Sequence, residues 1–327
     1  MKSSPLLAWR SAAQRRRFSG GLAQVEAMLS DVAGRYPGDL GAACRSTLAA
    51  GGKRVRPLLV LLCASREREF STPVLSAAAS VELLHMATLV HDDVLDAAEL
   101  RRGCPTVAHE LGVQTAVSAG NYLFAQAFGL LANSDNADAV DRLSDVALGL
   151  SQGELLQMGD SFRLTVTRAE YMRRCELKTA NLFAAACSLG ALLSGAQAET
   201  VDGLGAFGRA LGLAFQVFDD ILDLTGDEKA MGKRRGTDLR GGTITLPLVL
   251  ALEARPELGP RLQGPTVDEP AVQAIIADVR ATGALEQARE YALAHIAAAR
   301  EELGRLPDEV DKQLLSEVAG AVVDRYS

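Results

Sequence analysis

The chain has 327 residues, of which 48% are hydrophobic and 23% are charged. A chain of this length and composition buries a large core, which argues against a disordered protein, a mini-domain or a disulfide scaffold. The formal net charge of −7 argues against a nucleic-acid-binding protein, which needs a basic surface to displace counterions. Aromatic residues account for only 5%, whereas Ala, Leu and Gly are abundant, and this balance favours packed helices over a β-sandwich.

The first 20 residues form a basic segment with five Lys and Arg side chains and no acidic one. Its apolar run from Leu6 to Trp9 is too short for the core of a signal peptide. A targeting peptide, a contact with a membrane surface and a solvated tail all remain open, and the tail is the interpretation that we prefer. We therefore expect residues 1–20 to be a basic N-terminal arm without fixed structure and residues 21–327 to form one domain.

The cysteines point to a reducing compartment. They are odd in number and widely spaced, without a CxxC pair, so neither a disulfide framework nor a zinc site is indicated; they are Cys44, Cys63, Cys104, Cys175 and Cys187. Judged from the sequence alone, no apolar stretch approaches the roughly 18 to 20 residues that span a bilayer. We expect a cytoplasmic protein without a transmembrane segment.

Helical patterns recur from about Gly21 to the C-terminus and show no strand-like alternation. Clusters of Gly, Pro, Asp and Asn predict breaks between these helices; they lie at 36–39, 103–105, 133–136, 226–242 and 256–270. No stretch is long or polar enough to be a linker between two domains. These features predict a single all-α domain.

One acidic pattern, Asp-Asp-x-x-Asp, occurs twice, at His91–Asp96 and at Phe218–Asp223. Because an α-helix turns about 100° per residue, positions i and i+4 lie on one face. Asp92 and Asp96 therefore share a stripe with His85 and Thr88, and Asp219 and Asp223 share one with Gln216. A single copy is more typical of a solvated helix end, but two copies with matched apolar flanks favour a site.

Crowded carboxylates repel one another and are costly to bury unpaired, so both clusters require cations. Oxygen ligands without His or Cys at matching spacing favour Mg²⁺ or Mn²⁺, and Mg²⁺ commonly shares its coordination with water and the phosphates of a substrate. The paired motifs therefore predict a metal-bound phosphate or diphosphate substrate.

Basic residues occur in four groups that suit such a substrate. Lys53 and Arg56 lie in the motif Gly51–Pro57, at a predicted helix start that itself favours anions. The other groups have simpler explanations as well, such as compensation of a helix dipole or a solvated charge run; they are Arg101-Arg102, Lys178-Thr179 and Lys233-Arg234-Arg235.

His85 also belongs to an ExxH pattern with Glu82, which is typical of di-iron helical bundles. A di-iron site needs a second ExxH, and neither His91, His109 nor His295 supplies one. His85 is better interpreted as a donor to a diphosphate, and His91 as a packed or capping group.

From about Val25 to Tyr326 the chain resembles the all-trans isoprenyl diphosphate synthases of the polyprenyl synthetase family, of the medium- or long-chain type. The resemblance rests on several motifs that together are highly specific: GGKRVRP at 51–57, HDDVLD at 91–96 with RRG at 101–103, KTA at 178–180, FQVFDDILDLTGD at 215–227, and GKRRGTDL with TLP at 232–247.

The resemblance implies a single-domain antiparallel helical bundle around a central cavity, usually a homodimer. It implies condensation of isopentenyl diphosphate with an allylic diphosphate by ionisation, condensation and elimination, with Mg²⁺ or alternatively Mn²⁺ as cofactor, in three ions. The implied metal ligands are Asp92, Asp96, Asp219 and Asp223, of which Asp223 acts either directly or through water. Asp93 and Asp220 support these ligands. The resemblance places isopentenyl diphosphate on Lys53, Arg56, His85 and Arg102, and the allylic diphosphate on Arg101, Lys178, Thr179, Gln216 and Lys233.

In this family the residues one to two turns before the first acidic motif form the floor of the tunnel for the growing chain. Here they are Leu84, Ala87 and Thr88, with no Phe or Tyr just before the motif. We expect a product of geranylgeranyl length or longer, and a peripheral membrane contact for its release. In the alternative interpretation, Phe124 or Phe128 closes the tunnel from a neighbouring helix.

Two residues depart from the family pattern, and one of them, Asn121, stands where an acid is common. Thr243 stands where many members have a Lys, so one contact to diphosphate or metal is missing or is made by Arg240 instead.

Two other functions compete with the synthase. Class I terpene cyclases share the fold and the first motif, but their second motif typically mixes Asn, Ser or Thr and Glu, and they need no second diphosphate clamp. A non-catalytic helical subunit that regulates a partner synthase is the other alternative, although such subunits generally lose acidic residues. A purely structural scaffold explains neither the acidic nor the basic groups.

Overall fold

The computed structural model describes residues 11–64, 69–226, 235–262, 264 and 268–324. The first helix, α1 (Ala12–Gly34), begins where the Ser11 side chain accepts a hydrogen bond from the backbone N–H of Gln14 at 3.1 Å. Its residue Phe18 is 3% exposed and belongs to the core. The expected boundary of the basic arm at residue 20 is therefore wrong, because an N-cap and a buried aromatic side chain bring residues 12–20 into the helix. The rest of the arm, residues 1–10, lies outside the described residues.

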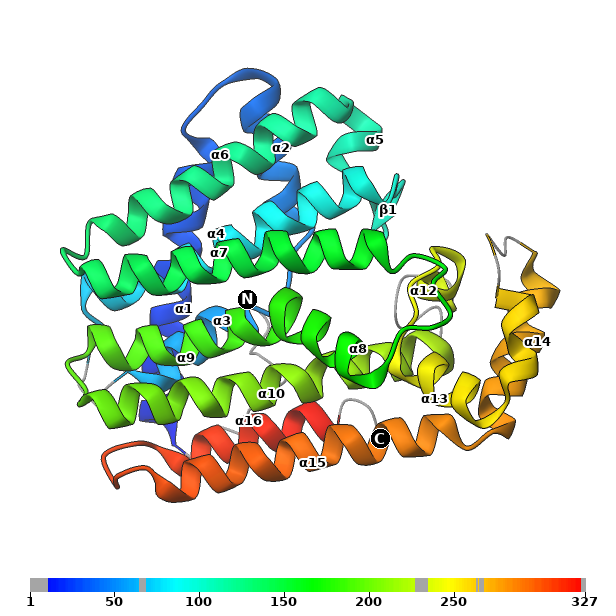
Figure 1. Ribbon diagram of the computed structural model, residues 1–327. Coiled ribbons are helices and arrows are strands. Elements are labelled where there is room, and N and C mark those ends of the chain that lie inside the picture. Colours follow the sequence, from blue (N-terminus) through cyan, green and yellow to red (C-terminus); the bar gives the residue numbers. More distant parts are fainter. Residues whose placement is uncertain (1–10, 65–68, 227–234, 263, 265–267, 325–327) are drawn as a thin grey trace.

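The chain folds as stacked layers of long helices (Figure 1). The N-terminal half comprises α1, α2 (Gly38–Ala49), α3 (Val55–Cys63), α4 (Thr72–Leu95), α5 (Val107–Leu111), α6 (Val113–Ala132) and α7 (Ala137–Gly159). The next part comprises α8 (Arg168–Cys175), the π-helical turn η1 (Glu176–Ala180), α9 (Asn181–Leu193) and α10 (Ala198–Thr225).

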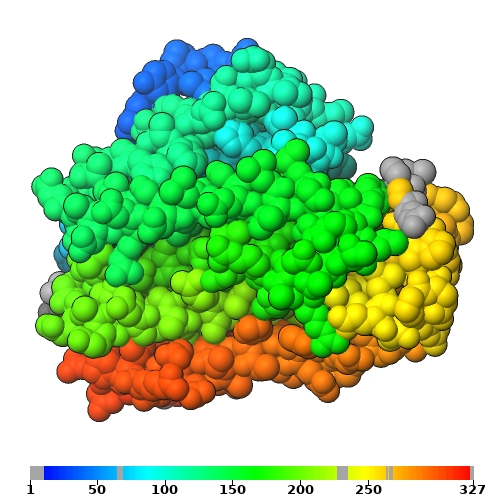
Figure 2. Space-filling view, in the orientation of Figure 1, coloured from blue at the N-terminus to red at the C-terminus, as the bar shows by residue number. Residues whose placement is uncertain are grey.

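The C-terminal part begins with α12 (Thr237–Arg240), α13 (Leu246–Ala254) and the 3₁₀ turn η2 (Pro256–Leu262), and continues with α14 (Glu269–Ala281), α15 (Ala284–Arg305) and α16 (Lys312–Asp324). α4 packs on α6, α3 on α9, and α10 on both α9 and α15. The space-filling view shows α7 to α10 and α15 as successive bands of one face (Figure 2).

The predicted breaks at 36–39 and 133–136 are confirmed as connections between helices, and Asn136 caps α7 by accepting from the N–H of Ala139 at 2.9 Å. The break at 103–105 contains a feature that the sequence did not indicate. Strands β1 (Leu100–Arg101) and β2 (Cys104–Pro105) form a two-residue antiparallel ribbon. This ribbon folds the chain back directly after the first acidic motif.

α4 is more apolar than the sequence analysis recognised. Its 24 residues are long and apolar enough to span a bilayer by length and composition, but 78% of the apolar window is buried inside the protein. Such burial is typical of the core helix of a globular fold. The buried hydrophobic residues form one connected cluster that runs from Phe18 in α1 to Val322 in α16.

Candidate functional site

The first acidic motif lies at the C-terminal end of α4. Asp93 is buried at 5% exposure, and its Oδ1 accepts a hydrogen bond from Nε of Arg101 in β1 at 2.7 Å. Asp92 is half-buried and Asp96, the C-cap of the helix, is exposed. The outer aspartates therefore face the surroundings of the helix end, while the middle one is bound by the ribbon that follows.

The second motif lies in the last turns of α10. Asp219 is half-buried, whereas Asp220 and Asp223 are 4% and 1% exposed. Oδ2 of Asp223 accepts from the backbone N–H of Asp238 in α12 at 3.2 Å. The middle aspartate is again bound by the protein, because Asp220 accepts from Tyr171 Oη at 2.6 Å and from Gln216 Nε2 at 2.8 Å.

Lys178 and Thr179 lie between the two motifs, on η1. The ammonium of Lys178 forms an ion pair with Glu154 of α7, and both charges act on Asp92 and Asp96. Thr179 Oγ1 donates to Gln216 Oε1 at 2.7 Å, which connects η1 to Asp220. The short segment η1 thus reaches the residues around the first motif through Lys178 and those around the second motif through Thr179.

The close packing of α7 on η1 sets the position of Lys178. A Cβ atom added at Gly153 would lie 2.7 Å from Cγ of Lys178 and 3.0 Å from Cβ of Leu177. Only glycine lets the lysine stem cross α7 at this point. Single π-helical turns inside α-helices are frequent at functional sites.

Burial changes the protonation of both motifs. Desolvation raises the pKa of Asp92 to about 7; Lys178 opposes this rise, while Glu154 and Asp96 add to it. Desolvation also raises the pKa of Asp220 to about 7, against the hydrogen bonds from Tyr171 and Gln216. A nearby cation favours the ionised form of such carboxylates.

The acidic donor set suits Mg²⁺. Within the described part of the chain, no three carboxylate, imidazole or thiol groups are gathered closely enough to hold a metal ion by themselves. Mg²⁺ usually keeps several waters and binds through one or two carboxylates together with substrate phosphates. Asp92, Asp96, Asp219 and Asp223 offer oxygen ligands of this kind, and the rest of the coordination falls to water and diphosphate.

The loop between α2 and α3 is held by Arg54, a residue that the sequence analysis passed over. Arg54 has a φ of 50°, in the left-handed region, and is the N-cap residue of α3. Its Nε lies 2.5 Å from Glu26 of α1, and its Nη1 lies 2.9 Å from Glu82 of α4. Glu82 is thereby paired with Arg54, which argues against the di-iron interpretation of the ExxH pattern.

The predicted basic residues gather on the α4 side of this loop. Arg56 stacks on the Phe183 ring at 4.8 Å, and its buried Nε has no hydrogen-bond partner among the described residues. Burial lowers the pKa of Arg56 to about 10 and that of His85 well below its ordinary value, and Arg102 adds to both effects. This accumulation of positive charge favours binding of an anion.

A pocket of about 500 Å³ of empty space, part of it open to solvent, adjoins these residues. It is lined by Gly51, His85, Arg101 and Arg102, among others, with Met86 and Val90 supplying apolar walls. The exposed Arg102 donates to the backbone oxygen of Gly51, so the ribbon and the glycine loop meet here. Lys53 is exposed on the same loop, and Lys233 lies outside the described residues.

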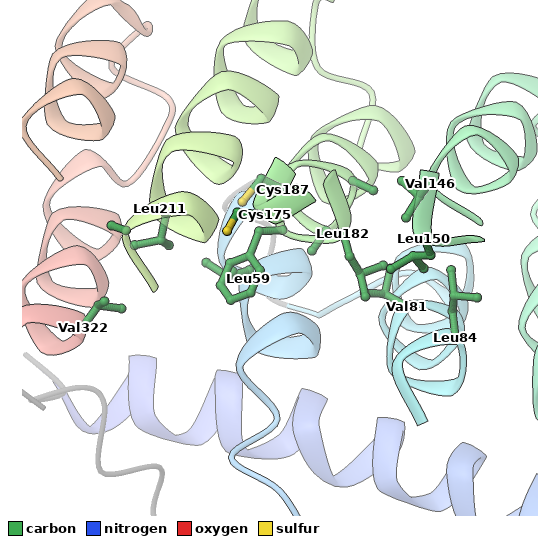
Figure 3. Packing of buried hydrophobic residues seen from close by; sticks show 14 of the residues in the cluster. Leu59, Val81, Leu84, Val146, Leu150, Cys175, Leu182, Cys187, Leu211 and Val322 are labelled. Atoms are coloured by element: carbon green, nitrogen blue, oxygen red, sulfur yellow. The ribbon is translucent and has the colours of Figure 1, made fainter. Parts of the chain in front are cut away.

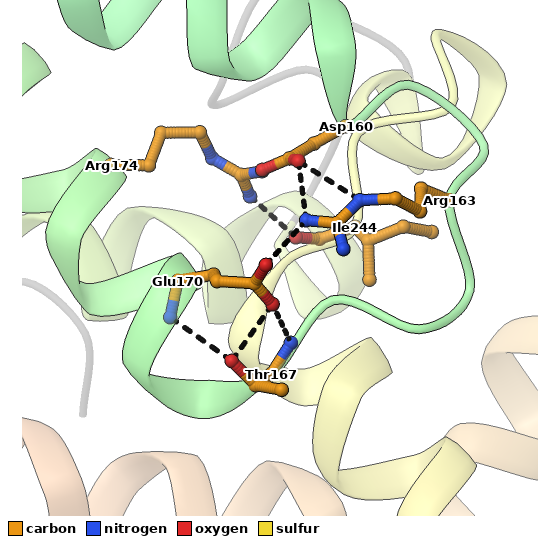
Figure 4. A network of polar contacts seen from close by, with 6 residues as sticks. All are labelled: Asp160, Arg163, Thr167, Glu170, Arg174 and Ile244. Atoms are coloured by element: carbon orange, nitrogen blue, oxygen red, sulfur yellow. Dashed lines mark hydrogen bonds and ion pairs between the residues drawn. The ribbon is translucent and has the colours of Figure 1, made fainter.

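A network of charged side chains holds the Gly241–Ile244 segment (Figure 4). Buried Arg174 of α8 contacts Asp160 at 3.1 Å and the Ile244 carbonyl oxygen at 2.5 Å. Arg163 joins Asp160 to Glu170. Ion pairs and backbone contacts thus fix the segment next to the C-terminal end of α7.

Thr243, which the sequence analysis singled out as a departure from the family pattern, lies in this segment. Arg240, which was expected to replace a missing Lys contact, pairs with Glu269 of α14 at 2.5 Å. The expectation that Arg240 also contacts diphosphate or metal stays a prediction.

The predicted tunnel floor is apolar. Leu84 and Ala87 are fully buried, and Thr88 donates its hydroxyl to the His85 carbonyl oxygen at 2.8 Å. Leu84 lies with Val81 opposite side chains of α7 (Figure 3); these are Val146 and Leu150. The alternative aromatic residues lie on α6, where Phe124 is 36% exposed and packs on Phe128 at 5.2 Å.

Three residues that contact the predicted site were missed, namely Arg54, Glu154 and Tyr171. Arg54 belongs to the motif at 51–57, in which only Lys53 and Arg56 were predicted to bind ligand. Glu154 and Tyr171 belong to helices whose approach to the motifs depends on tertiary packing. Only the position of Tyr171, seven residues before Lys178, gives a signal, since two helical turns place both on similar faces.

Comparison with known proteins gives a consistent result. The polyprenyl synthetase family model matches residues 38–279. Heptaprenyl diphosphate synthase component 2 of Geobacillus stearothermophilus is 40% identical over 277 residues, which cover 84% of this chain and 86% of that protein. Geranylgeranyl diphosphate synthase of Methanosarcina mazei is 36% identical over 295 residues, covering 88% and 90%.

Among solved structures, the polyprenyl synthase of Caulobacter crescentus in complex with calcium and isoprenyl diphosphate matches with a TM-score of 0.86 at 31% identity. The match covers 94% of this chain and 96% of that chain. The fold and the matches define an all-α prenyltransferase that condenses isopentenyl diphosphate, as the sequence predicted. The chain belongs to the polyprenyl synthetase family.

Proposed function

We propose that the site joins isopentenyl diphosphate to an allylic diphosphate in a Mg²⁺-dependent reaction and releases an all-trans polyprenyl diphosphate of geranylgeranyl length or longer. The observation that carries the proposal is the placement of η1. Lys178 acts on the first acidic motif, and Thr179 reaches the second through Gln216. Two motifs far apart in the sequence thereby border one site.

The outer aspartates hold the metal ions in this proposal. Asp92 and Asp96 bind them from α4, and Asp219 and Asp223 bind them from α10, with three ions in all and Mn²⁺ as a substitute. Bound Mg²⁺ stabilises negative charge on a departing pyrophosphate. Asp93 and Asp220 keep their protein partners and support their neighbours.

The basic groups divide between the two diphosphates. Arg101, Lys178, Thr179, Gln216 and Lys233 orient the allylic partner. Arg56, His85 and Arg102, with Lys53, hold isopentenyl diphosphate next to the pocket beside α4. Holding both partners in reacting geometry lowers the entropic part of the barrier. The proton lost at the end goes to the released pyrophosphate.

The direct test is incubation of the purified protein with labelled isopentenyl diphosphate and allylic primers of several lengths. With Mg²⁺ we expect elongated products, and with EDTA we expect none. The Asp92→Asn variant should lose activity. The Asp308→Asn variant is the control and should retain it, because Asp308 is exposed and lies far from both acidic motifs in the sequence. Absence of elongation with every primer would favour the regulatory subunit.

We also propose a homodimer. Large apolar side chains on α7 are exposed, including Leu148 at 63% and Leu155 at 68%, seven residues apart on one face. Extensive exposed apolar patches mark interaction sites. A heteromer is the second candidate, because the Geobacillus relative is named as component 2 of its synthase.

We further propose that the protein works in the cytoplasm and makes peripheral membrane contact when it releases its product. All five cysteines are free thiols, and four of them are buried, which supports a reducing compartment. A prenyl product of this length is strongly apolar, so transfer to a bilayer is favourable.

A further inference from the structure

Four polar side chains form a continuous hydrogen-bonded chain beneath the proposed metal site. Tyr171 Oη donates to Asp220 Oδ2 at 2.6 Å, and Gln216 Nε2 donates to Asp220 Oδ1 at 2.8 Å. Thr179 Oγ1 donates to Gln216 Oε1 at 2.7 Å. The chain joins three elements, because Tyr171 lies on α8, Thr179 on η1, and the other two on α10.

The hydrogen bonds converge on Asp220 from both sides. Because Thr179 donates to the carbonyl oxygen of the Gln216 amide, the NH₂ group of that amide must point to Asp220. The carboxylate of Asp220 then receives one donor on each oxygen. Tyr171, Thr179 and Asp220 are 1%, 7% and 4% exposed, so water has little access to replace any of these bonds.

Two members of this hydrogen-bonded chain are next to residues that bind ligand in the proposed function. Asp220 adjoins Asp219, and Thr179 adjoins Lys178. Asp93 shows a parallel arrangement in the first motif, where Arg101 binds the middle aspartate. In both motifs a side chain of the protein therefore binds the middle carboxylate.

We propose that Tyr171 is a positioning residue of the metal-diphosphate site. Its hydroxyl holds Asp220, and through Gln216 and Thr179 it fixes where Asp219 and Lys178 meet the ligand. Tyr171 itself touches neither metal nor substrate. The inference rests on the proposed function, because it gives that site its support.

The test measures binding and does not depend on turnover. Inorganic pyrophosphate is titrated into the full chain in excess Mg²⁺ by isothermal calorimetry. Tyr171→Phe removes only the hydroxyl oxygen, and we expect the Kd for pyrophosphate to rise about 10- to 100-fold, the range usual for residues that support metal ligands. The matched control is Tyr122→Phe, whose hydroxyl donates to the Val32 carbonyl oxygen at 2.9 Å away from the site; its Kd should equal that of the wild type.

A double-mutant cycle separates positioning from general stability. If Tyr171 acts through Asp220, Tyr171→Phe should not weaken pyrophosphate binding further in an Asp220→Asn background. A lower melting temperature with an unchanged Kd would overturn the inference, and so would an equal rise in Kd in both backgrounds. A wild-type protein that does not bind pyrophosphate with Mg²⁺ would instead refute the proposed function, and this inference with it.

Discussion

Arg54 shows how a single residue prepares the proposed binding site for isopentenyl diphosphate. It adopts a left-handed backbone conformation, which is unfavourable for a residue with a Cβ. Two carboxylates from α1 and α4 compensate by fixing its guanidinium, and one of them, Glu82, is 3% exposed. The neighbouring Lys53 on the loop and Arg56 in the first turn of α3 are thereby held in place.

Arg54→Ala should lower the free energy of unfolding by about 3 kcal/mol, because it leaves Glu82 as a buried charge without its partner. Urea denaturation measures this change. Arg305→Ala is the control: Arg305 is exposed and pairs with Glu301 and Glu302 on the surface, so its loss should cost less than about 1 kcal/mol. If both variants lose the same free energy of unfolding, the buried ion pair contributes no more to stability than the surface pair.

The proposed tunnel floor, and with it the product length, also depends on single residues. Ala87→Phe or Thr88→Phe should shorten the product, because the ring would occupy space directly before the first acidic motif, in the direction of Leu84. Chromatographic sizing of labelled products measures the length. Ala298→Phe on the exposed face of α15 is the control and should leave the product unchanged. Unaltered product length in both floor variants would contradict the assignment.

At the scale of elements, the contact between α7 and η1 sets the position of the lysine between the two motifs. Gly153→Ala should reduce kcat/KM for the allylic diphosphate roughly 10- to 100-fold, since displacement of a catalytic group by about 1 Å has an effect of this size. Gly159→Ala lies in the same helix, and an added Cβ there meets nothing within 4 Å. Steady-state kinetics that show equal losses in both variants would argue against a role for this packing.

The start of α8 is a second element with a measurable consequence. Hydrogen bonds from the backbone N–H and the hydroxyl of Thr167, followed by that from Arg163, lower the pKa of Glu170 to about 2 from an ordinary value of 4.5. A depressed pKa stabilises the fold above pH 4.5, and the contribution is lost as the pH falls towards 2. Glu170→Gln should therefore be less stable than wild type at neutral pH.

Chemical denaturation at pH values above and below 4.5 tests this expectation. The difference between Glu170→Gln and wild type should shrink as the pH falls, because protonation removes the same charge from the wild-type protein. A difference that stays constant across this range would show that the capping contacts do not depend on the ionised carboxylate.

The elements also show where sequence reasoning succeeds and where it ends. The i, i+4 spacing of Asp92 and Asp96 is a local property of any helix, so the shared face was predictable. The partners of the middle aspartates differ in this respect. Arg101 is near in sequence, but Tyr171 reaches Asp220 only because α8 packs on α10. The start of α1 at Ala12 was missed because the basic residues of this segment suggested a solvated tail, although Phe18 within it is buried.

At the scale of the whole molecule, the proposed site depends on η1, which packs on α7 on one side and on α10 on the other. The ribbon after α4 and the segment before α13 lie toward the same end of the bundle, at the right of Figure 1. Long helices provide rigid supports, while the residues that bind ligand lie near their ends. Four large apolar side chains of α7 are exposed, namely Leu148, Leu155, Leu156 and Met158, while Glu154 of the same helix pairs with Lys178.

That apolar surface gives the last prediction. Leu155→Glu should convert the proposed homodimer into a monomer, because a charge would be buried in the interface without a partner. Leu293→Glu on α15 is the matched control, since Leu293 is an isolated exposed leucine at 39% and lies outside α7. Analytical ultracentrifugation of the wild type and both variants measures the assembly. A monomeric wild type would contradict the homodimer and direct attention to the second candidate, a different partner chain seated on α7.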